Sequence, residues 1–226
     1  MNDRNKEIVQ YYERLAKDYD KDRFGNSYGR YIDAQERRVL DALDIDTRKA
    51  LDLPCGTGRL LDYAAHGADA SENMLEVARE RYKDKALTCC NAMDLPFEDH
   101  TFGTVITMHF LMHLDLETIR KVMLNVHRVL LPGGRWIVDV PSLKRRKLLD
   151  ADNKGWHGNT ALDYEEVESM VSGLFSVKSV HGMMMIPVHR LPDRVRMAFC
   201  GMDYRFAQIN CLKGYSSYLI YELCKL

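Results

Sequence analysis

The decapeptide LDLPCGTGRL at residues 51–60 constrains the fold of this chain more than any other segment. An apolar strand is expected over Ala50–Leu53, followed by a turn with Gly56 and Gly58 and then by a short helix. Such a unit turns backbone N–H groups and a helix N-terminus toward an anionic or zwitterionic ligand. Asp52, at the end of the strand, can accept a hydrogen bond from an ammonium or hydroxyl group. Taken alone, the segment also fits an ordinary tight turn between a strand and a helix.

A nicotinamide or flavin dinucleotide site is the main competing interpretation of this glycine-rich turn. Its G-x-G-x-x-G fingerprint requires a third glycine where this chain has Leu61. It also requires an acidic residue about 20 positions further on, which is not clearly present. The sequence therefore does not favour a dinucleotide.

Strand and helix patterns alternate along the rest of the chain. Because parallel strands are joined by crossover helices, this order predicts a mainly parallel sheet covered on both faces, in a single domain over residues 1–226. Helices are expected over Glu7–Asp18, Tyr31–Leu43, Ser71–Tyr82, Leu116–Leu130, Tyr164–Leu174 and Arg194–Phe206, and further strands over Gly67–Ala70, Ala86–Asn91, Thr104–Met108, Arg135–Val140, Phe175–Val180 and Ser216–Cys224.

Composition narrows the function classes. The 226 residues are 46% hydrophobic and carry a net charge of −1, without the basic excess of a bulk nucleic-acid binder. Six cysteines form no CxxC pair, so reduced thiols and a cytoplasmic location are expected. His and Cys show no metal-ligand spacing. No apolar leader or stretch long enough to span a membrane is seen, so no membrane partner is expected.

Four segments, in order, resemble motifs of the class I S-adenosylmethionine-dependent methyltransferases. The acidic-x-Gly-x-Gly-x-Gly motif matches residues 52–58, with Pro54 in place of the first glycine. GADASENML at 67–75, CNAMDLPF at 90–97 and HRVLLPGG at 127–134 resemble the next three motifs. The resemblance implies a Rossmann-like, mainly parallel seven-stranded sheet with N-terminal lid helices over residues 1–45. A helical flap over the acceptor site is expected at 189–213, before the last strand.

The family resemblance also implies the cofactor, S-adenosylmethionine, with S-adenosylhomocysteine as product. Asp69 would accept hydrogen bonds from both ribose hydroxyls. Asn91 would accept from the adenine amino group, and Ala92 or Met93 would donate a backbone N–H to a ring nitrogen. The full set of implied cofactor residues is Tyr19, Arg23, Asp52, Pro54, Gly56, Gly58, Asp69, Ala70, Met74, Asn91, Ala92, Met93 and Met108.

The segment between Gly58 and Asp69 is shorter than family members usually have. Its eleven steps permit about 10 Å of helix and a return of about 10–13 Å of strand. The chain can therefore close only with a stunted helix, a very short strand and almost no loop. The alternative is that residues are missing between about Tyr63 and Gly67.

Methyl transfer from a sulfonium is an in-line displacement, so the protein mainly has to align donor and acceptor. A base is needed only where the acceptor loses a proton. His109 follows a strand at the ligand end of the sheet and is a candidate for the acceptor pocket or the base. His157, between glycines in GWHG, is the second candidate. Each also fits a structural or surface histidine.

The sequence thus predicts methylation of a small molecule by a monomer or homodimer, with nucleic acid disfavoured. A tRNA or other RNA methyltransferase is one alternative, and it would need the basic run at 144–147 and the flap arginines to form one patch. A catalytically silent cofactor-binding protein of the same fold is the other, because fold alone does not establish activity.

Overall fold

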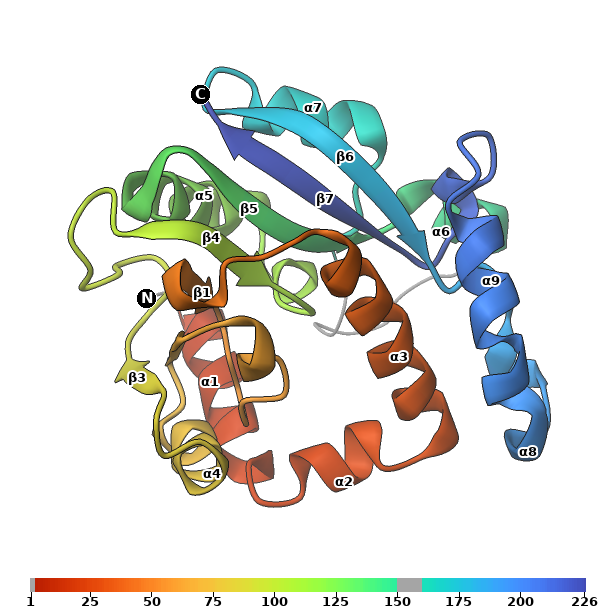
Figure 1. Cartoon of the computed structure of the whole chain (residues 1–226), viewed down its shortest axis with the longest axis horizontal. Helices are drawn as coiled ribbons and strands as arrows, with labels where there is room; N and C mark the ends of the chain where they lie inside the picture. Colours follow the sequence, from red (N-terminus) through yellow and green to blue (C-terminus); the bar gives the residue numbers. More distant parts are fainter. Residues whose placement is uncertain (1–2, 150–159) are drawn as a thin grey trace.

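The computed structural model describes residues 3–149 and 160–226, and a seven-stranded sheet forms its centre (Figure 1). The strand order is β3-β2-β1-β4-β5-β7-β6. The first five strands along the chain pair in parallel, whereas β7 runs antiparallel to both β5 and β6. This confirms the mainly parallel seven-stranded sheet. The strands are β1 (Ala50–Asp52), β2 (His66–Asp69), β3 (Ala86–Cys89), β4 (Phe102–Thr107), β5 (Leu130–Pro141), β6 (Phe175–Met183) and β7 (Tyr218–Lys225).

Helices begin where polar side chains cap free backbone N–H groups. The Ser71 hydroxyl accepts from Met74 N at 3.2 Å, and the Asp115 carboxylate accepts from Thr118 N at 2.7 Å. The helices are α1 (Asp3–Leu15), α2 (Tyr19–Phe24), α3 (Ser27–Ala42), α4 (Glu72–Arg81), α5 (Leu116–Val129), α6 (Leu143–Leu149), α7 (Tyr164–Val171), α8 (Asp193–Arg196) and α9 (Cys200–Ala207).

Successive residues of a strand point to opposite faces of the sheet, and both faces here carry apolar side chains. Helices therefore cover both faces. Leu51 and Val105 belong to the core beneath α5 and α7, which also receives Ile8 of α1. Ile106 and Ile137 belong to the core beneath α3 and α9. The first three helices follow one another around the ends of β1 and β2 (Figure 1), which places them beside the glycine turn.

The helix expected after the glycine turn is reduced to one turn, as the short spacing between Gly58 and Asp69 requires. A single 3₁₀ turn, Leu61–Tyr63, connects the turn to β2, and His66 already pairs with Leu51. The chain therefore closes without additional residues. α3 supports the shortened segment, since Arg37 Nη2 donates to the Arg59 carbonyl at 2.7 Å.

Three further segments differ in detail from the expectations. The strand expected over Arg135–Val140 begins earlier: β5 runs from Leu130 to Pro141, and Gly133 within it has a φ of +69°. The expected helix over 194–206 is divided into α8, a 3₁₀ turn at 197–199 and α9. β6 runs to the buried Met183, three residues beyond the expected end of that strand at Val180.

The expected flap at 189–213 does not line the cavity described below. It packs against α3 and β6 instead. Arg196 Nη1 donates to the Ser27 hydroxyl at 2.8 Å. The buried Asp203 carboxylate accepts from the Tyr31 hydroxyl at 2.7 Å and from Ile186 N at 2.8 Å. These buried contacts fix the segment to the domain away from the cavity.

Candidate functional site

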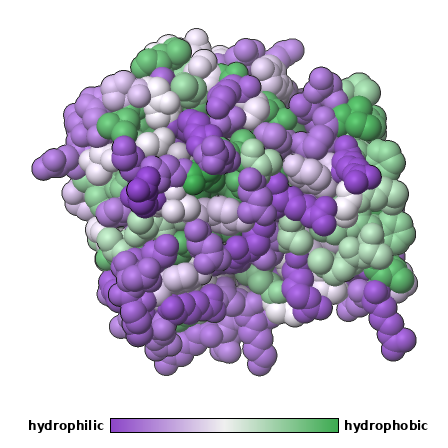
Figure 2. Space-filling view, in the orientation of Figure 1, coloured by the Kyte–Doolittle hydropathy of each residue, from purple (hydrophilic) through white to green (hydrophobic). Residues whose placement is uncertain are grey.

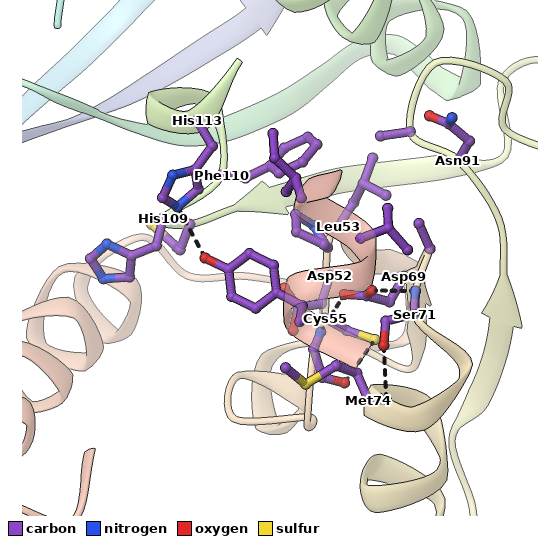
Figure 3. A pocket seen from close by; sticks show the side chains of 18 of the residues that line it. Asp52, Leu53, Cys55, Asp69, Ser71, Met74, Asn91, His109, Phe110 and His113 are labelled. Carbon is purple, nitrogen blue, oxygen red and sulfur yellow. Dashed lines mark hydrogen bonds between the residues drawn. The ribbon is translucent and has the colours of Figure 1, made fainter. Parts of the chain in front are cut away.

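A cavity opens at the carboxyl ends of β1, β2 and β4, beneath α1 and α2 (Figure 3). This is the edge where open α/β sheets bind ligands. Most residues predicted to contact the cofactor line it, together with the first histidine candidate. They are Tyr19, Asp52, Pro54, Gly56, Asp69, Ala70, Met74, Asn91, Ala92, Met93, Met108 and His109.

The two glycines of the turn have different roles. Gly56 has a φ of +52°, and a Cβ added there would meet no atom within 4 Å. It therefore leaves space for a ligand. Gly58 has a φ of +85° and does not line the cavity. A Cβ there would lie 3.3 Å from Ala78, so Gly58 permits close packing of the turn against α4.

Asp69 is held in place by the backbone of the turn and of the next helix. Its Oδ2 accepts from Gly56 N and its Oδ1 from Ser71 N, each at 2.8 Å. The Gly56 amide is thus not a bare donor for a ligand, as its sequence suggested, but orients Asp69. Burial raises the pKa of Asp69 to about 6, although these two N–H donors oppose the shift. Each carboxylate oxygen keeps a second lone pair for a further donor.

Asp52 is a buried carboxyl at the base of the cavity, with 2% of its surface exposed. Burial raises its pKa to about 8; Arg59 opposes the shift, and the neighbouring carboxylates of Asp69 and Glu36 add to it. The Arg59 guanidinium lowers the pKa of Asp52 less than burial raises it. A cationic ligand beside Asp52 would favour its ionised form.

A buried ionic cluster joins α3 to the ends of β4 and β5. Glu36, fully buried in α3, lies 2.6 Å from Arg59 Nη1 through Oε2 and contacts His109 Nε2 through Oε1. Asp139 of β5 accepts from His109 N at 2.7 Å, and its Oδ2 lies 3.6 Å from His109 Nδ1. Both imidazole nitrogens therefore face carboxylates.

This cluster sets the charge of His109. Burial lowers the pKa of His109, but Glu36 and Asp139 outweigh burial and raise it. Burial likewise opposes ionisation of Glu36, yet Arg59 and His109 bring its pKa down to about 2. Burial raises the pKa of Asp139 to about 6 against the effect of His109. The two carboxylates, mainly Glu36, therefore favour the imidazolium form of His109.

Asn91 lies at the opposite end of the pocket from His109 (Figure 3). Its Oδ1 accepts from Met93 N at 2.9 Å, and Met93 O accepts from Asn125 Nδ2 at 2.7 Å. The Met93 amide thus already has an acceptor. Of the two amides proposed for the adenine ring nitrogen, Ala92 fits better.

The first two helices close over the cavity through polar contacts. The Tyr12 hydroxyl of α1 lies 3.1 Å from His113 Nε2 (Figure 3), and the Thr57 hydroxyl donates to Asp20 of α2 at 2.7 Å. Tyr19 lines the cavity as expected, but Arg23 does not; its Nη2 donates to the Tyr11 hydroxyl at 3.4 Å. Helices α1 and α2, within the residues 1–45 expected to hold a lid, therefore border the cavity.

Known proteins share this architecture and these motifs. A family model described as a methyltransferase domain matches residues 51–138. A demethylmenaquinone methyltransferase of Thermotoga maritima is 32% identical over 180 residues, which are 76% of this chain and 75% of that protein. The chain belongs to the class I S-adenosylmethionine-dependent methyltransferases. The family and enzyme class expected from the sequence are thereby confirmed.

Other relatives of this methyltransferase differ in how much they share with it. A demethylmenaquinone methyltransferase of Symbiobacterium thermophilum is 37% identical over 145 residues, 58% of this chain, but the match spans only 57% of that relative's length. A crystal structure of an S-adenosylmethionine-dependent methyltransferase from Thermotoga maritima, described as a possible histamine N-methyltransferase, has a TM-score of 0.71 and 18% identity. The match covers 97% of this chain and 100% of the Thermotoga chain. Because the two sequences are only 18% identical, this similarity supports the fold alone.

The cavity of this methyltransferase fits S-adenosylmethionine. The space in front of Gly56 would be filled by a side chain at that position. Asp69 presents carboxylate lone pairs suited to a diol, and Asp52 is a buried acidic group suited to an ammonium. The donor set of the cavity therefore matches the ribose and the amino-acid end of the cofactor.

Sequence reasoning missed three charged members of this methyltransferase site. Asp139 carried a usable signal, because an acidic residue interrupts the apolar strand Trp136–Val140. Arg59 adjoins the glycine turn and could have been proposed from its position. Glu36 carried no local signal, since an exposed and a buried glutamate in a helix look alike in sequence. His157 lies outside the described residues.

Two global properties of the methyltransferase concern the described ranges 3–149 and 160–226. Within them, no helix combines the length and apolar character needed to cross a bilayer. The same ranges hold no group of three or more His, Cys, Asp or Glu side chains arranged to bind a metal ion.

Proposed function

We propose that this protein transfers a methyl group from S-adenosylmethionine to a small-molecule acceptor. The observation that carries the proposal is the pairing of Asp69 with the open space at Gly56, at the carboxyl end of the sheet. The cofactor supplies an activated methyl group on a sulfonium. The task of the protein is to hold that group in line with the acceptor and to exclude water.

Each end of the cavity has a defined task in this proposal. Asp69 binds the ribose hydroxyls, and its own orientation is maintained by Gly56 N and Ser71 N. Asp52 binds the ammonium group as a carboxylate. Ala92 donates its N–H to the adenine ring, while Tyr19 covers the cofactor from the lid.

His109 serves as a positioning residue in this proposal rather than as a base. Its two nitrogens face Glu36 and Asp139 rather than the acceptor, and its raised pKa favours the protonated ring, which has no lone pair for an acceptor proton. Its φ of +54° and the bond from its N–H to Asp139 hold the chain at the end of β4 in one conformation. The role proposed for His157 stays a prediction.

Relatives support a small acceptor over RNA. Proteins named demethylmenaquinone methyltransferase and ubiquinone/menaquinone biosynthesis C-methyltransferase are among the similar sequences. Two arginines that an RNA site would require are bound within the protein: Arg145 donates to the carbonyls of Met185 and Tyr215 at 2.8 and 2.7 Å, and Arg196 Nε donates to Val188 O at 2.9 Å. A cytoplasmic location and a monomeric or homodimeric state stay predictions.

Calorimetric titration with S-adenosylmethionine and S-adenosylhomocysteine tests the cofactor directly. We expect saturable binding of both, and no binding of either would refute the proposal. A panel of small-molecule acceptors, read out by release of S-adenosylhomocysteine, then identifies the substrate. Binding without turnover on the panel, together with turnover on tRNA, would favour the RNA alternative instead.

A further inference from the structure

The segment from α8 to the end of the loop after α9 exposes many large apolar side chains. Between 37% and 43% of each is accessible to solvent. In the view of Figure 2, hydrophobic surface gathers at the side where Figure 1 places α8 and α9. The exposed apolar residues of this segment are Val195, Met197, Met202, Phe206, Ile209 and Leu212.

Their spacing shows that α9 has an apolar outer face. Cys200, Asp203 and Ala207 form the buried face of this helix, at intervals of three and four residues. Met202 and Phe206, four residues apart, lie outside that buried face and are exposed, as is Arg205 between them in the sequence. A surface helix ordinarily turns polar residues outward, so this pattern calls for a partner.

The same segment is basic. Residues 189–213 contain five Lys or Arg but only two Asp, in a chain whose net charge is −1. Asp203 is fully buried, and Asp193 pairs with Arg196 at 2.8 Å. The exposed side chains of Arg190, Arg194 and Arg205 therefore give the segment that carries the apolar residues a positive charge.

We propose that this face, defined by the six apolar residues above and the three exposed arginines, docks on an anionic lipid surface. Apolar side chains together with basic ones match the acyl boundary and headgroups of such a surface. A second copy of the chain fits less well, because an isologous contact would bring the exposed arginines of both copies together. The contact is peripheral and revises the expectation that the chain has no membrane partner. It does not depend on the proposed methyl transfer.

Co-sedimentation of the full chain with vesicles tests this proposal. We expect binding to vesicles of equal parts phosphatidylglycerol and phosphatidylcholine, weakened by salt, and little binding to phosphatidylcholine alone. The double variant Met202→Ser/Phe206→Ser should lower the affinity about tenfold or more, because two apolar side chains no longer enter the acyl boundary. Arg194→Glu/Arg205→Glu should also weaken binding and reduce its salt dependence.

The matched control is Leu124→Ser, which changes a 53% exposed apolar residue on α5 and should bind vesicles like the unmodified protein. Circular dichroism and thermal melting establish that the exposed substitutions leave the fold intact. Equal binding to neutral and anionic vesicles, or unchanged binding of the Met202/Phe206 variant, would overturn the proposal. So would a dimer of the unmodified protein that this variant converts to a monomer.

Discussion

Substitution of Asp52 by Asn is expected to abolish a proton release that accompanies S-adenosylhomocysteine binding. Asp52 is 2% exposed, and burial, reinforced by Asp69 and Glu36 against the effect of Arg59, raises its pKa to about 8. At pH 7 the carboxyl of the free protein is thus about nine-tenths protonated. Because the ligand's ammonium requires a carboxylate, binding should expel about 0.9 proton.

The same shift predicts how affinity depends on pH. Ionising Asp52 one pH unit below its pKa costs about 1.4 kcal/mol, so affinity should rise about tenfold from pH 6 to pH 7. The rise should slow near pH 8, where about half of Asp52 is already ionised in the free protein. Above that pH the ligand's own α-amino group, with a pKa of about 7.7–8.0, loses its charge and affinity should fall. The expected profile is a bell centred near pH 8.

Calorimetry at pH 7 in phosphate and in Tris measures the proton count, because the two buffers differ in ionisation enthalpy. The unmodified protein and the control Asp84→Asn, which changes an exposed aspartate before β3, should each release about one proton. Asp52→Asn should release almost none. No proton release by the unmodified protein, or unchanged release by Asp52→Asn, would show that this carboxyl does not receive the ammonium.

Three further substitutions test other parts of the site. Asp69→Ala should weaken S-adenosylhomocysteine binding about 10- to 100-fold through loss of charge-assisted hydrogen bonds, and calorimetry showing unchanged affinity would contradict the ribose contact. Gly29→Ala places a Cβ against the backbone carbonyl oxygen of Arg23, so α2 must shift. We expect the free energy of unfolding to fall by about 1–3 kcal/mol, measured by thermal melting. An unchanged melting temperature would contradict this packing. Glu36→Gln should destabilise the protein by about 3–5 kcal/mol and lower the pKa of His109 in an NMR titration. Because the raised pKa of His109 contributes stability that is lost as pH rises through it, the stability gap should narrow at high pH; an unshifted imidazole titration would contradict the pairing.

Local sequence patterns determined the elements and most of the cofactor end of the site. The spacing of apolar residues showed which side of each strand and helix is buried. The alternation of strands and helices then predicted the mainly parallel sheet. The motif around Gly56 and Asp69 predicted which strand ends form the cavity. The motif residues that line this cavity lie within a few positions of a strand end. Short sequence segments are therefore enough to identify the ligand-binding site.

Only the tertiary structure decided the remainder, because the deciding contacts join residues distant in the chain. Glu36, Arg59, His109 and Asp139 come from α3, the glycine turn, the segment after β4, and β5, and their mutual distances favour the charged form of His109. The segment before β2 could close with a single 3₁₀ turn because α3 packs against it. The apolar outer face of α9 became visible only once burial of Asp203 showed which side of that helix faces the domain. Sequence patterns locate a face on each element, but packing determines what that face meets.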